Sequence, residues 1–197
     1  MISPVYWHPR IYDAFLAILT GRERRERLLV VAREIRDGEE VLDVCCGTAA
    51  LARTALRGRP VSYLGLDENP RFVRWLERRG IRARVHDVLA DPLPPADCVV
   101  LQASLYQFHA EAVPLLRRLR AAARRRVVVS EPVSNFAQSR LPGVSRLAAF
   151  GAATLRGPQA FRYDEAGFRR VSAEAGATRV YPAGRDLVAV FETGSAP

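Results

Sequence analysis

Apolar and polar residues alternate with two different periods along most of this chain. From Val41 onward, short apolar runs alternate with stretches in which apolar residues recur every three or four positions. The runs at 97–102 and 126–130 are apolar almost throughout, which is typical of strands covered on both faces of a parallel sheet. The pattern predicts strands at 41–45, 61–66, 82–86, 97–102 and 126–130, and helices at 49–57, 70–79 and 110–124.

The alternation of strands and helices indicates right-handed crossovers and a doubly wound α/β sheet with helices on both faces. A final helix is predicted at 164–175, and two strands follow at 178–181 and 186–192. Because only a short turn containing Pro-Ala-Gly separates these two strands, we expect them to pair in an antiparallel manner. Together with the five earlier runs they make seven strands.

The basic residues bear on the function classes that the chain can serve. The formal net charge is +9, and all 30 basic residues are arginine. Such a charge is compatible with a nucleic-acid or acidic-membrane partner. However, the arginines are spread over many segments, and those at 22–27 alternate with Glu23 and Glu26, which favours a solvated helix face. Whether the charge is functional or reflects a GC-rich genome stays open.

Neither a membrane span nor a secretory leader is expected. No run approaches the roughly 20 apolar residues that a span needs, and the N-terminus carries Pro, His and Arg where a signal peptide would be apolar. The cysteines, Cys45, Cys46 and Cys98, lack metal-ligand spacing. We therefore predict free thiols, no metal site and a reducing, cytoplasmic compartment, while peripheral contact with a membrane stays open.

The most informative segment is Val41-Leu42-Asp43-Val44-Cys45-Cys46-Gly47-Thr48-Ala49. An apolar strand that carries an acid leads into a turn of small residues and then into a helix. In an open parallel sheet this order brings backbone N–H groups up to a ligand, and small residues allow the close approach. Asp67 and Asp87 stand at the ends of the next two predicted strands. One such acid is often only a helix N-cap, but three in succession beside this turn predict a ligand site.

The segment 41–49 resembles the first motif of the class I S-adenosylmethionine-dependent methyltransferases, in a form similar to that of quinone-biosynthesis and related small-molecule branches. Later segments resemble the family's following motifs in the same order, namely Tyr63–Pro70, Val85–Val88 and Asp97–Ser104. The resemblance covers about residues 38–132, and Cys45 and Ala49 stand where the family usually has glycine. A nicotinamide site would instead require Gly-x-Gly-x-x-Gly after the first strand, which is absent.

The resemblance implies a Rossmann-like sheet of seven strands, mostly parallel with one antiparallel strand, S-adenosylmethionine as cofactor and S-adenosylhomocysteine (SAH) as product. Asp43 would help to hold the ammonium end of the cofactor, and Asp67 would accept hydrogen bonds from both ribose hydroxyls. Asp87 would accept from the adenine amine, with the Val88 N–H facing a ring nitrogen. The predicted cofactor-binding set is Tyr12, Asp43, Cys45, Gly47, Thr48, Asp67, Glu68, Asp87, Val88 and Gln102.

Catalytic residues are less sharply indicated. Methyl transfer needs a base only when the acceptor must lose a proton, as a hydroxyl does. His109 suits the role of base, Tyr106 could position an acceptor, and Glu131, at the end of the fifth strand, could bind a substrate amine. Each of these side chains also has a structural explanation, as a cap or as a buried hydrogen-bonding group.

The whole chain is expected to form a single methyltransferase domain. Helical spacing before the first strand predicts two helices, one ending at Gly21 and one over about 22–35, and a Pro- and Gly-punctuated insertion is predicted to hold a helix at about 142–155. The domain would comprise a helical lid, a cofactor-binding core, an insertion that caps the substrate, and a C-terminal helix with its strand pair, at 1–39, 40–132, 133–163 and 164–197.

We therefore predict an S-adenosylmethionine-dependent methyltransferase that acts on a small organic, amphiphilic or lipid-like acceptor. The alternatives are an RNA methyltransferase, which only the high isoelectric point supports, and a non-catalytic S-adenosylmethionine-binding subunit. No segment has the basic and aromatic composition of a nucleic-acid platform, so nucleic acid is not an expected partner. The acceptor, its methylated atom and the oligomeric state stay open.

Overall fold

The computed structural model describes residues 7–133, 153–154, 157–158 and 161–194. A seven-stranded sheet with the strand order β3-β2-β1-β4-β5-β9-β8 forms its centre. The strands are β1 (Glu40–Val44), β2 (Ser62–Asp67), β3 (Ala83–Val85), β4 (Ala96–Gln102), β5 (Ala123–Pro132), β8 (Arg179–Ala183) and β9 (Asp186–Glu192). Neighbours from β3 to β5 are parallel, whereas β9 is antiparallel to both β5 and β8. The predicted mostly parallel sheet with one antiparallel strand is therefore confirmed.

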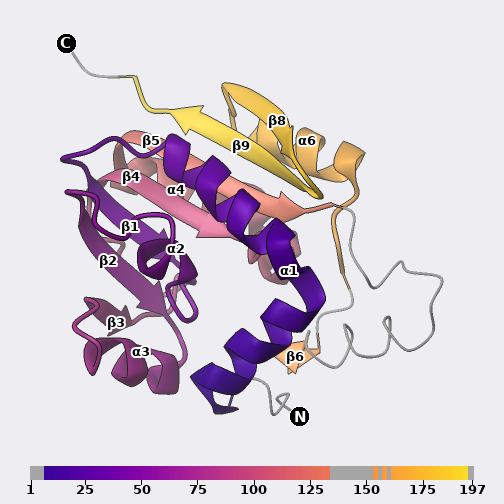
Figure 1. The fold of residues 1–197 in the computed structure, drawn as a ribbon. Coiled ribbons are helices and arrows are strands. Elements are labelled where there is room, and N and C mark those ends of the chain that lie inside the picture. Colours follow the sequence, from indigo (N-terminus) through magenta and orange to yellow (C-terminus); the bar gives the residue numbers. More distant parts are fainter. Residues whose placement is uncertain (1–6, 134–152, 155–156, 159–160, 195–197) are drawn as a thin grey trace, which may run out of the picture.

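Helices cover both faces of this sheet (Figure 1). Val31 packs with Val100 on one face, whereas Leu116 and Phe168 pack with Val99 on the other. Because adjacent residues of a strand point to opposite faces, β4 contributes to both cores and is buried along most of its length. The helices are α1 (Pro9–Arg33), α2 (Ala50–Arg53), α3 (Pro70–Glu77), the 3₁₀ helix η2 (Leu105–Glu111), α4 (Ala112–Ala122) and α6 (Glu165–Glu174).

Helix α1 consists of two parts that meet at Gly21. Gly21 has φ 47° and ψ −131°, which is not helical, so the predicted break between two N-terminal helices is present. Figure 1 shows that the part before Gly21 crosses the edge of the sheet where β1, β2 and β4 end, while the part after it packs along one face. The first part is therefore placed next to the predicted ligand site.

Two predicted boundaries are wrong. The helix predicted at 49–57 is confined to α2, because Thr54 leaves the helical region (φ −123°, ψ −73°) and its hydroxyl donates to the Ala50 carbonyl. The helix predicted to reach residue 124 ends at Ala122, and β5 begins at once. Arg124 forms ion pairs with Asp97 of the neighbouring strand β4 and with Glu40 of β1, the strand beyond it, so tertiary contacts hold this residue in the sheet.

The predicted helix at about 142–155 lies largely outside the described residues. Its last part is not helical, because β6 (Ala153–Thr154) pairs in an antiparallel manner with β7 (Gly157–Pro158). These four residues form a small antiparallel sheet that is separate from the seven-stranded sheet.

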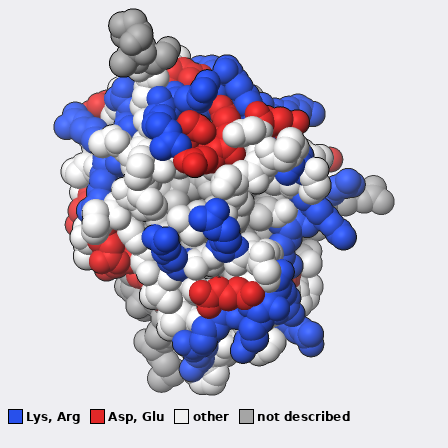
Figure 2. Space-filling model, turned by 90° about the vertical axis from the view of Figure 1, so that its left-hand side faces the viewer, with Lys and Arg blue, Asp and Glu red and all other residues white. Residues whose placement is uncertain are grey.

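Positive and negative side chains are interspersed on the surface. Figure 2 shows the side on which β2, β3 and α3 lie, where several separate groups of arginine stand beside groups of acids. This face has no continuous surface of one sign, and it does not favour a nucleic-acid partner. Within the described residues, no helix is long and apolar enough to cross a membrane.

Candidate functional site

The carboxyl ends of the parallel strands bring most of the predicted site residues to one edge of the sheet. Val44 of β1 lies beside Leu66 of β2 and Leu101 of β4, and Gln102 lies beside Ser130 of β5. The segments that follow these residues therefore share one edge, which is where ligands bind in open α/β sheets. The same edge carries Asp43, Asp67, Gln102 and Glu131.

The turn after β1 has an unusual backbone that Asp67 holds in place. Cys45, Gly47 and Ala49 all have positive φ, at 55°, 57° and 51°. The Gly47 N–H donates to Oδ2 of Asp67 over 2.8 Å, and the Asn69 N–H donates to its Oδ1 over 2.9 Å. Because each carboxylate oxygen has a second acceptor position, Asp67 can still bind two hydroxyl groups. Burial raises the pKa of Asp67 to about 6, and Glu68 adds to this rise.

Asp43 lies deeper than Asp67, and its side chain is buried. The Tyr63 hydroxyl donates to Oδ2 of Asp43 over 2.7 Å, and the Gln102 side chain forms a further hydrogen bond. These donors favour the charged carboxylate, but burial outweighs them and raises the pKa of Asp43 to about 7. The structure thus connects two of the predicted cofactor residues, Asp43 and Gln102, directly.

The predicted adenine-binding residues follow β3. Oδ1 of Asp87 accepts from the Leu89 N–H over 2.9 Å, and the Asp87 N–H donates to Asp91. Asp87 therefore also stabilises its own turn, which is the structural explanation that applies to many acids at strand ends. Val88 is buried, and Asp87 is half-buried.

Helix α1 places an aromatic side chain directly over the turn. A Cβ atom added to Gly47 would lie 3.6 Å from Cε1 and from the hydroxyl oxygen of Tyr12, so the tyrosine ring covers this glycine. The ring of Tyr12 also packs against that of Phe72, with centroids 5.1 Å apart. Burial raises the pKa of the Tyr12 hydroxyl, and the nearby Tyr106 and Asp67 add to the rise. Tyr12, Gly47, Asp67 and Tyr106 are thus gathered in one place.

Asp13, the residue after Tyr12, ties α1 to the same turn. Its Oδ1 accepts from the Thr48 hydroxyl over 2.7 Å, its Oδ2 accepts from the Arg53 guanidinium over 2.7 Å, and Arg24 lies 3.3 Å away. The sequence pattern singled out neither Asp13 nor Arg53. An acid on a helix beside an aromatic residue carries no motif, and its partners are known only once the fold places them.

The three predicted catalytic residues do not lie together. Glu131 is fully buried, and its Oε2 accepts from the Leu105 N–H at the start of η2 over 2.9 Å. Burial raises the pKa of Glu131 to about 8. The ring of Tyr106 lies under the Arg162 guanidinium, 4.0 Å from its centroid. His109 is exposed and stacks on Phe161, with centroids 4.4 Å apart. Glu131 and Tyr106 therefore lie at the sheet edge, and His109 lies at a pocket farther along η2.

Metal ligands are not gathered anywhere in the part of the chain that the structure describes. No group of three or more His, Cys, Asp or Glu side chains there could hold a metal ion. All three cysteines are free thiols, with Cys98 buried and Cys45 and Cys46 half-buried. The acids at the sheet edge accept hydrogen bonds from backbone and side-chain donors instead.

Neither a protein-family model nor a curated protein matches the sequence. Solved structures do match the fold. The structure described as PigF with SAH has 18% sequence identity and a TM-score of 0.69, with 96% of this chain and 61% of that chain covered. Mitomycin 7-O-methyltransferase MmcR has 18% identity and a TM-score of 0.62, with 85% and 53% covered. Magnesium protoporphyrin IX methyltransferase (ChlM) from Synechocystis PCC 6803 with bound SAH has 20% identity and a TM-score of 0.57, with 86% and 84% covered.

The chain spans only 53% of the length of MmcR and 61% of that of PigF. The part that it shares with them is the sheet with its helices on both faces, in line with the architecture predicted from the sequence. This chain therefore has the fold of the class I methyltransferases.

Proposed function

We propose that this protein is an S-adenosylmethionine-dependent methyltransferase that acts on a small organic acceptor. The observation that carries the proposal is the hydrogen bond between the Gly47 N–H and Asp67, which joins a turn of small residues to a carboxylate at the next strand end. A ligand at this point would meet bare backbone on one side and a hydroxyl-binding carboxylate on the other. A ribose with an attached chain presents these two features together.

The residues present fit this cofactor. Asp67 keeps acceptor positions for the two ribose hydroxyls, and Gly47 has no side chain of its own, so the ring of Tyr12 that covers it would have to move aside for the cofactor. Asp43 lies behind the turn and would act on the ammonium end through Gln102 or an intervening water molecule. Cys45 and Thr48 belong to the same turn as Gly47, and Glu68 follows Asp67. Asp87 with Val88 would hold the adenine. When bound, S-adenosylmethionine supplies an activated methyl group.

The first part of α1 would act as the lid of the cofactor site. Tyr12 covers Gly47, and Asp13 fastens the helix to Thr48 and Arg53. The break at Gly21 separates this part from the rest of α1, so it can move without unpacking the second part from the sheet. When this part of α1 lies over the bound cofactor, it would exclude water from the site, which favours transfer between aligned groups.

The acceptor would lie on the half of the edge formed by β4 and β5. Gln102, Tyr106 and Glu131 stand there, and Glu131 is placed to take a proton. An amphiphilic acceptor is included in the proposal, because Trp7, just before α1, and Ile11 and Ile18 of α1 are 57%, 53% and 77% exposed and could contact an apolar tail.

Calorimetric titration with SAH tests the cofactor proposal. The wild-type protein should bind SAH, and Gly47→Val should not, because a branched side chain would fill the approach to the backbone. Gly58→Val is the matched control, since Gly58 also has positive φ but no atom within 4 Å of an added Cβ. Equal SAH affinity in wild type and Gly47→Val would contradict the proposal. Transfer of labelled methyl groups in a metabolite extract then separates an enzyme from a non-catalytic binding subunit.

A further inference from the structure

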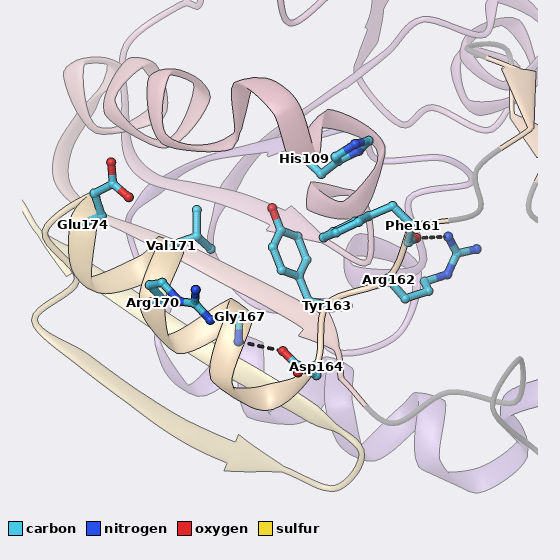
Figure 3. Close-up of a pocket in the computed structure, with 9 residues that line it drawn as sticks. All are labelled: His109, Phe161, Arg162, Tyr163, Asp164, Gly167, Arg170, Val171 and Glu174. Carbon is cyan, nitrogen blue, oxygen red and sulfur yellow. Dashed lines mark hydrogen bonds between the residues drawn. The ribbon is translucent and has the colours of Figure 1, made fainter.

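A pocket separate from the proposed cofactor site lies between η2 and α6. It has a volume of about 540 Å³, which is within the range of small-molecule sites. Figure 3 shows that Phe161 and Tyr163 lie between His109 of η2 on one side and α6 on the other. The hollow is lined by His109, Phe161, Arg162, Tyr163, Asp164, Gly167, Arg170, Val171 and Glu174, and we call it the α6 pocket.

Aromatic rings form the inner wall of the α6 pocket. Phe161 stacks on His109 with centroids 4.4 Å apart, and it meets Tyr163 edge-on at 4.8 Å. Tyr163 in turn meets Phe168 edge-on at 6.1 Å. Rings in these arrangements favour a further ring over an aliphatic group of similar size.

The charged groups at the rim of the α6 pocket balance one another. Arg162 and Arg170 are offset by Asp164 and Glu174. Arg162 is also held by the Tyr106 ring, and Asp164 caps α6 by accepting from the Gly167 N–H over 2.7 Å. Equal numbers of opposite charges do not favour a strongly charged ligand, so the pocket suits a neutral one.

Two buried polar atoms, one on a residue of the pocket wall and one on a residue behind it, lack hydrogen-bond partners. These are the hydroxyl of Tyr163 and Oε1 of Glu131, both buried and both without a partner among the described residues. The two groups lie close enough for Glu131 to raise the pKa of Tyr163, which burial brings to about 12. A buried polar atom without a partner is costly and calls for an explanation, such as a ligand that supplies the missing bond.

The inner end of the pocket adjoins the acceptor half of the sheet edge. Glu131 follows Ser130, which lies beside Gln102 of β4. Arg162, on the pocket rim, covers the ring of Tyr106. Phe161, which is 37% exposed, forms part of the pocket wall beside Tyr163.

We propose that the α6 pocket binds a neutral aromatic molecule through its ring and holds a hydroxyl group of that molecule between Tyr163 and Glu131. This molecule would be the methyl acceptor, an assignment that rests on the proposed function. When bound, the cofactor would supply the methyl group and keep the electron pair of its methyl–sulfur bond. A methyl–oxygen bond would form, and the phenolic proton would pass to Glu131 in its ionised form, which becomes populated as the pH approaches the pKa of about 8. Tyr163 is the positioning residue, and the motifs in the sequence did not indicate it.

Calorimetry with 2-naphthol tests the pocket, with decahydro-2-naphthol as the saturated counterpart. We expect 2-naphthol to bind at least tenfold more tightly than the saturated alcohol. Val171→Phe, which fills the pocket, should abolish this binding. Val180→Phe is the control, since Val180 is half-buried in β8 and does not line the pocket. Failure of 2-naphthol to bind, or equal binding by Val171→Phe, would overturn the proposal.

The variant Tyr163→Phe separates a ligand-binding hydroxyl from a structural one. Because this hydroxyl has no partner among the described residues, its removal should leave the melting temperature unchanged or raise it. The affinity for 2-naphthol should fall about fivefold or more, while that for SAH stays the same. A lower melting temperature with unchanged 2-naphthol affinity would show a structural role and contradict the proposal.

The two proposals fail in different ways. If SAH binds but 2-naphthol does not, only the α6 pocket assignment is wrong. If 2-naphthol binds and SAH does not, the methyltransferase proposal is wrong and the pocket remains an aromatic site. If both bind, methyl transfer in the extract should yield an aryl methyl ether and be lost in Val171→Phe but not in Val180→Phe, and any other methylated product would contradict the acceptor assignment.

Discussion

The buried carboxylates on the two halves of the sheet edge differ in how completely they are hydrogen-bonded. On the β1–β2 half, Asp43 is hydrogen-bonded to Tyr63 and Gln102, and both oxygens of Asp67 accept backbone N–H groups. On the β5 half, Oε1 of Glu131 has no partner among the residues described. A carboxylate with both oxygens bonded is held in one geometry before any ligand arrives, whereas one with a single bonded oxygen, such as Glu131, can be completed by its ligand. The first half is therefore ordered in advance, and the second depends on what binds.

The surroundings of Glu131 explain why its burial is costly. Asp186 lies nearby and raises the pKa of Glu131 further by charge repulsion. Asp186 is itself paired with Arg27 of α1 at 3.0 Å and accepts from the Ser130 hydroxyl over 2.9 Å. Arg27 is thus paired with Asp186, whereas Glu131 receives the N–H groups at the start of η2 and an attraction from Arg162, which together do not offset the effect of its burial on its pKa.

The largest effect should come from Glu131→Gln, measured as stability against pH. Because burial raises the pKa of Glu131 from 4.5 to about 8, the folded state keeps a proton that the unfolded chain releases. Its contribution is complete below about pH 4.5 and is lost as pH rises to about 8. At about 1.4 kcal/mol per pKa unit, wild type should lose about 4 kcal/mol more than the variant over this window. The raised pKa values of Asp43 and Asp67 add to the pH dependence of stability in the same direction, but equally in wild type and variant, so they cancel in the comparison.

Denaturant titrations at pH 5 and pH 8 would measure this difference. Glu77→Gln, at an exposed position on α3, is the control and should follow wild type. Parallel pH dependences of wild type and Glu131→Gln would show that Glu131 is not the uncompensated group, and the contrast between the two halves would no longer hold.

A smaller effect is expected from Asp67→Asn, measured by SAH affinity. The amide NH₂ group would face the N–H of Gly47 or Asn69, so the variant loses one acceptor and disturbs the turn. We expect binding to weaken by about 2 kcal/mol, or roughly 30-fold. Asp37→Asn, which alters an exposed ion pair with Arg59, should bind SAH like wild type. Unchanged affinity in Asp67→Asn would remove Asp67 from the site.

The variants Tyr63→Phe and Tyr163→Phe remove one hydroxyl group from each half of the sheet edge, so their losses of unfolding free energy can be compared directly. Tyr63 donates to buried Asp43, so its variant should lose about 1.5 kcal/mol of unfolding free energy. Tyr163→Phe should lose almost none, since its hydroxyl is unbonded within the described structure. Thermal and chemical denaturation of the two variants side by side would check this, and equal losses would contradict it.

The smallest effect should come from Asp13→Asn, measured as the rate of SAH dissociation. The variant weakens the ion pairs of Asp13 with Arg53 and Arg24, which are partly exposed and therefore contribute about 0.5–1 kcal/mol. Dissociation should become about two- to fivefold faster in stopped-flow measurements. Glu165→Gln, which alters the exposed pair with Arg169 on α6, should not change the rate. The lid proposal is wrong if the Asp13 variant releases SAH at the wild-type rate.

The parts of this structure that could be predicted from the sequence are those that repeat or follow a motif. The alternating pattern identified the strands of the sheet, and the ordered motifs identified Asp43, Gly47 and Asp67 at one edge. Asp13 and Tyr163 could not be predicted, because each acquires its role from residues far away in the sequence. The early start of β5 has the same cause, since Arg124 is held by Glu40 of β1.

Arg53 lies between the first part of α1 and helix α3. One side of its guanidinium binds Asp13 of the lid, and its carbon centre lies 5.0 Å from the ring centroid of Trp75. Trp75 is one of only two tryptophans in the chain, so Trp7→Phe would leave it as the sole indole fluorophore. Its emission would then change whenever the cation above it shifts, and the opening of the lid could be followed optically in the protein without any attached dye.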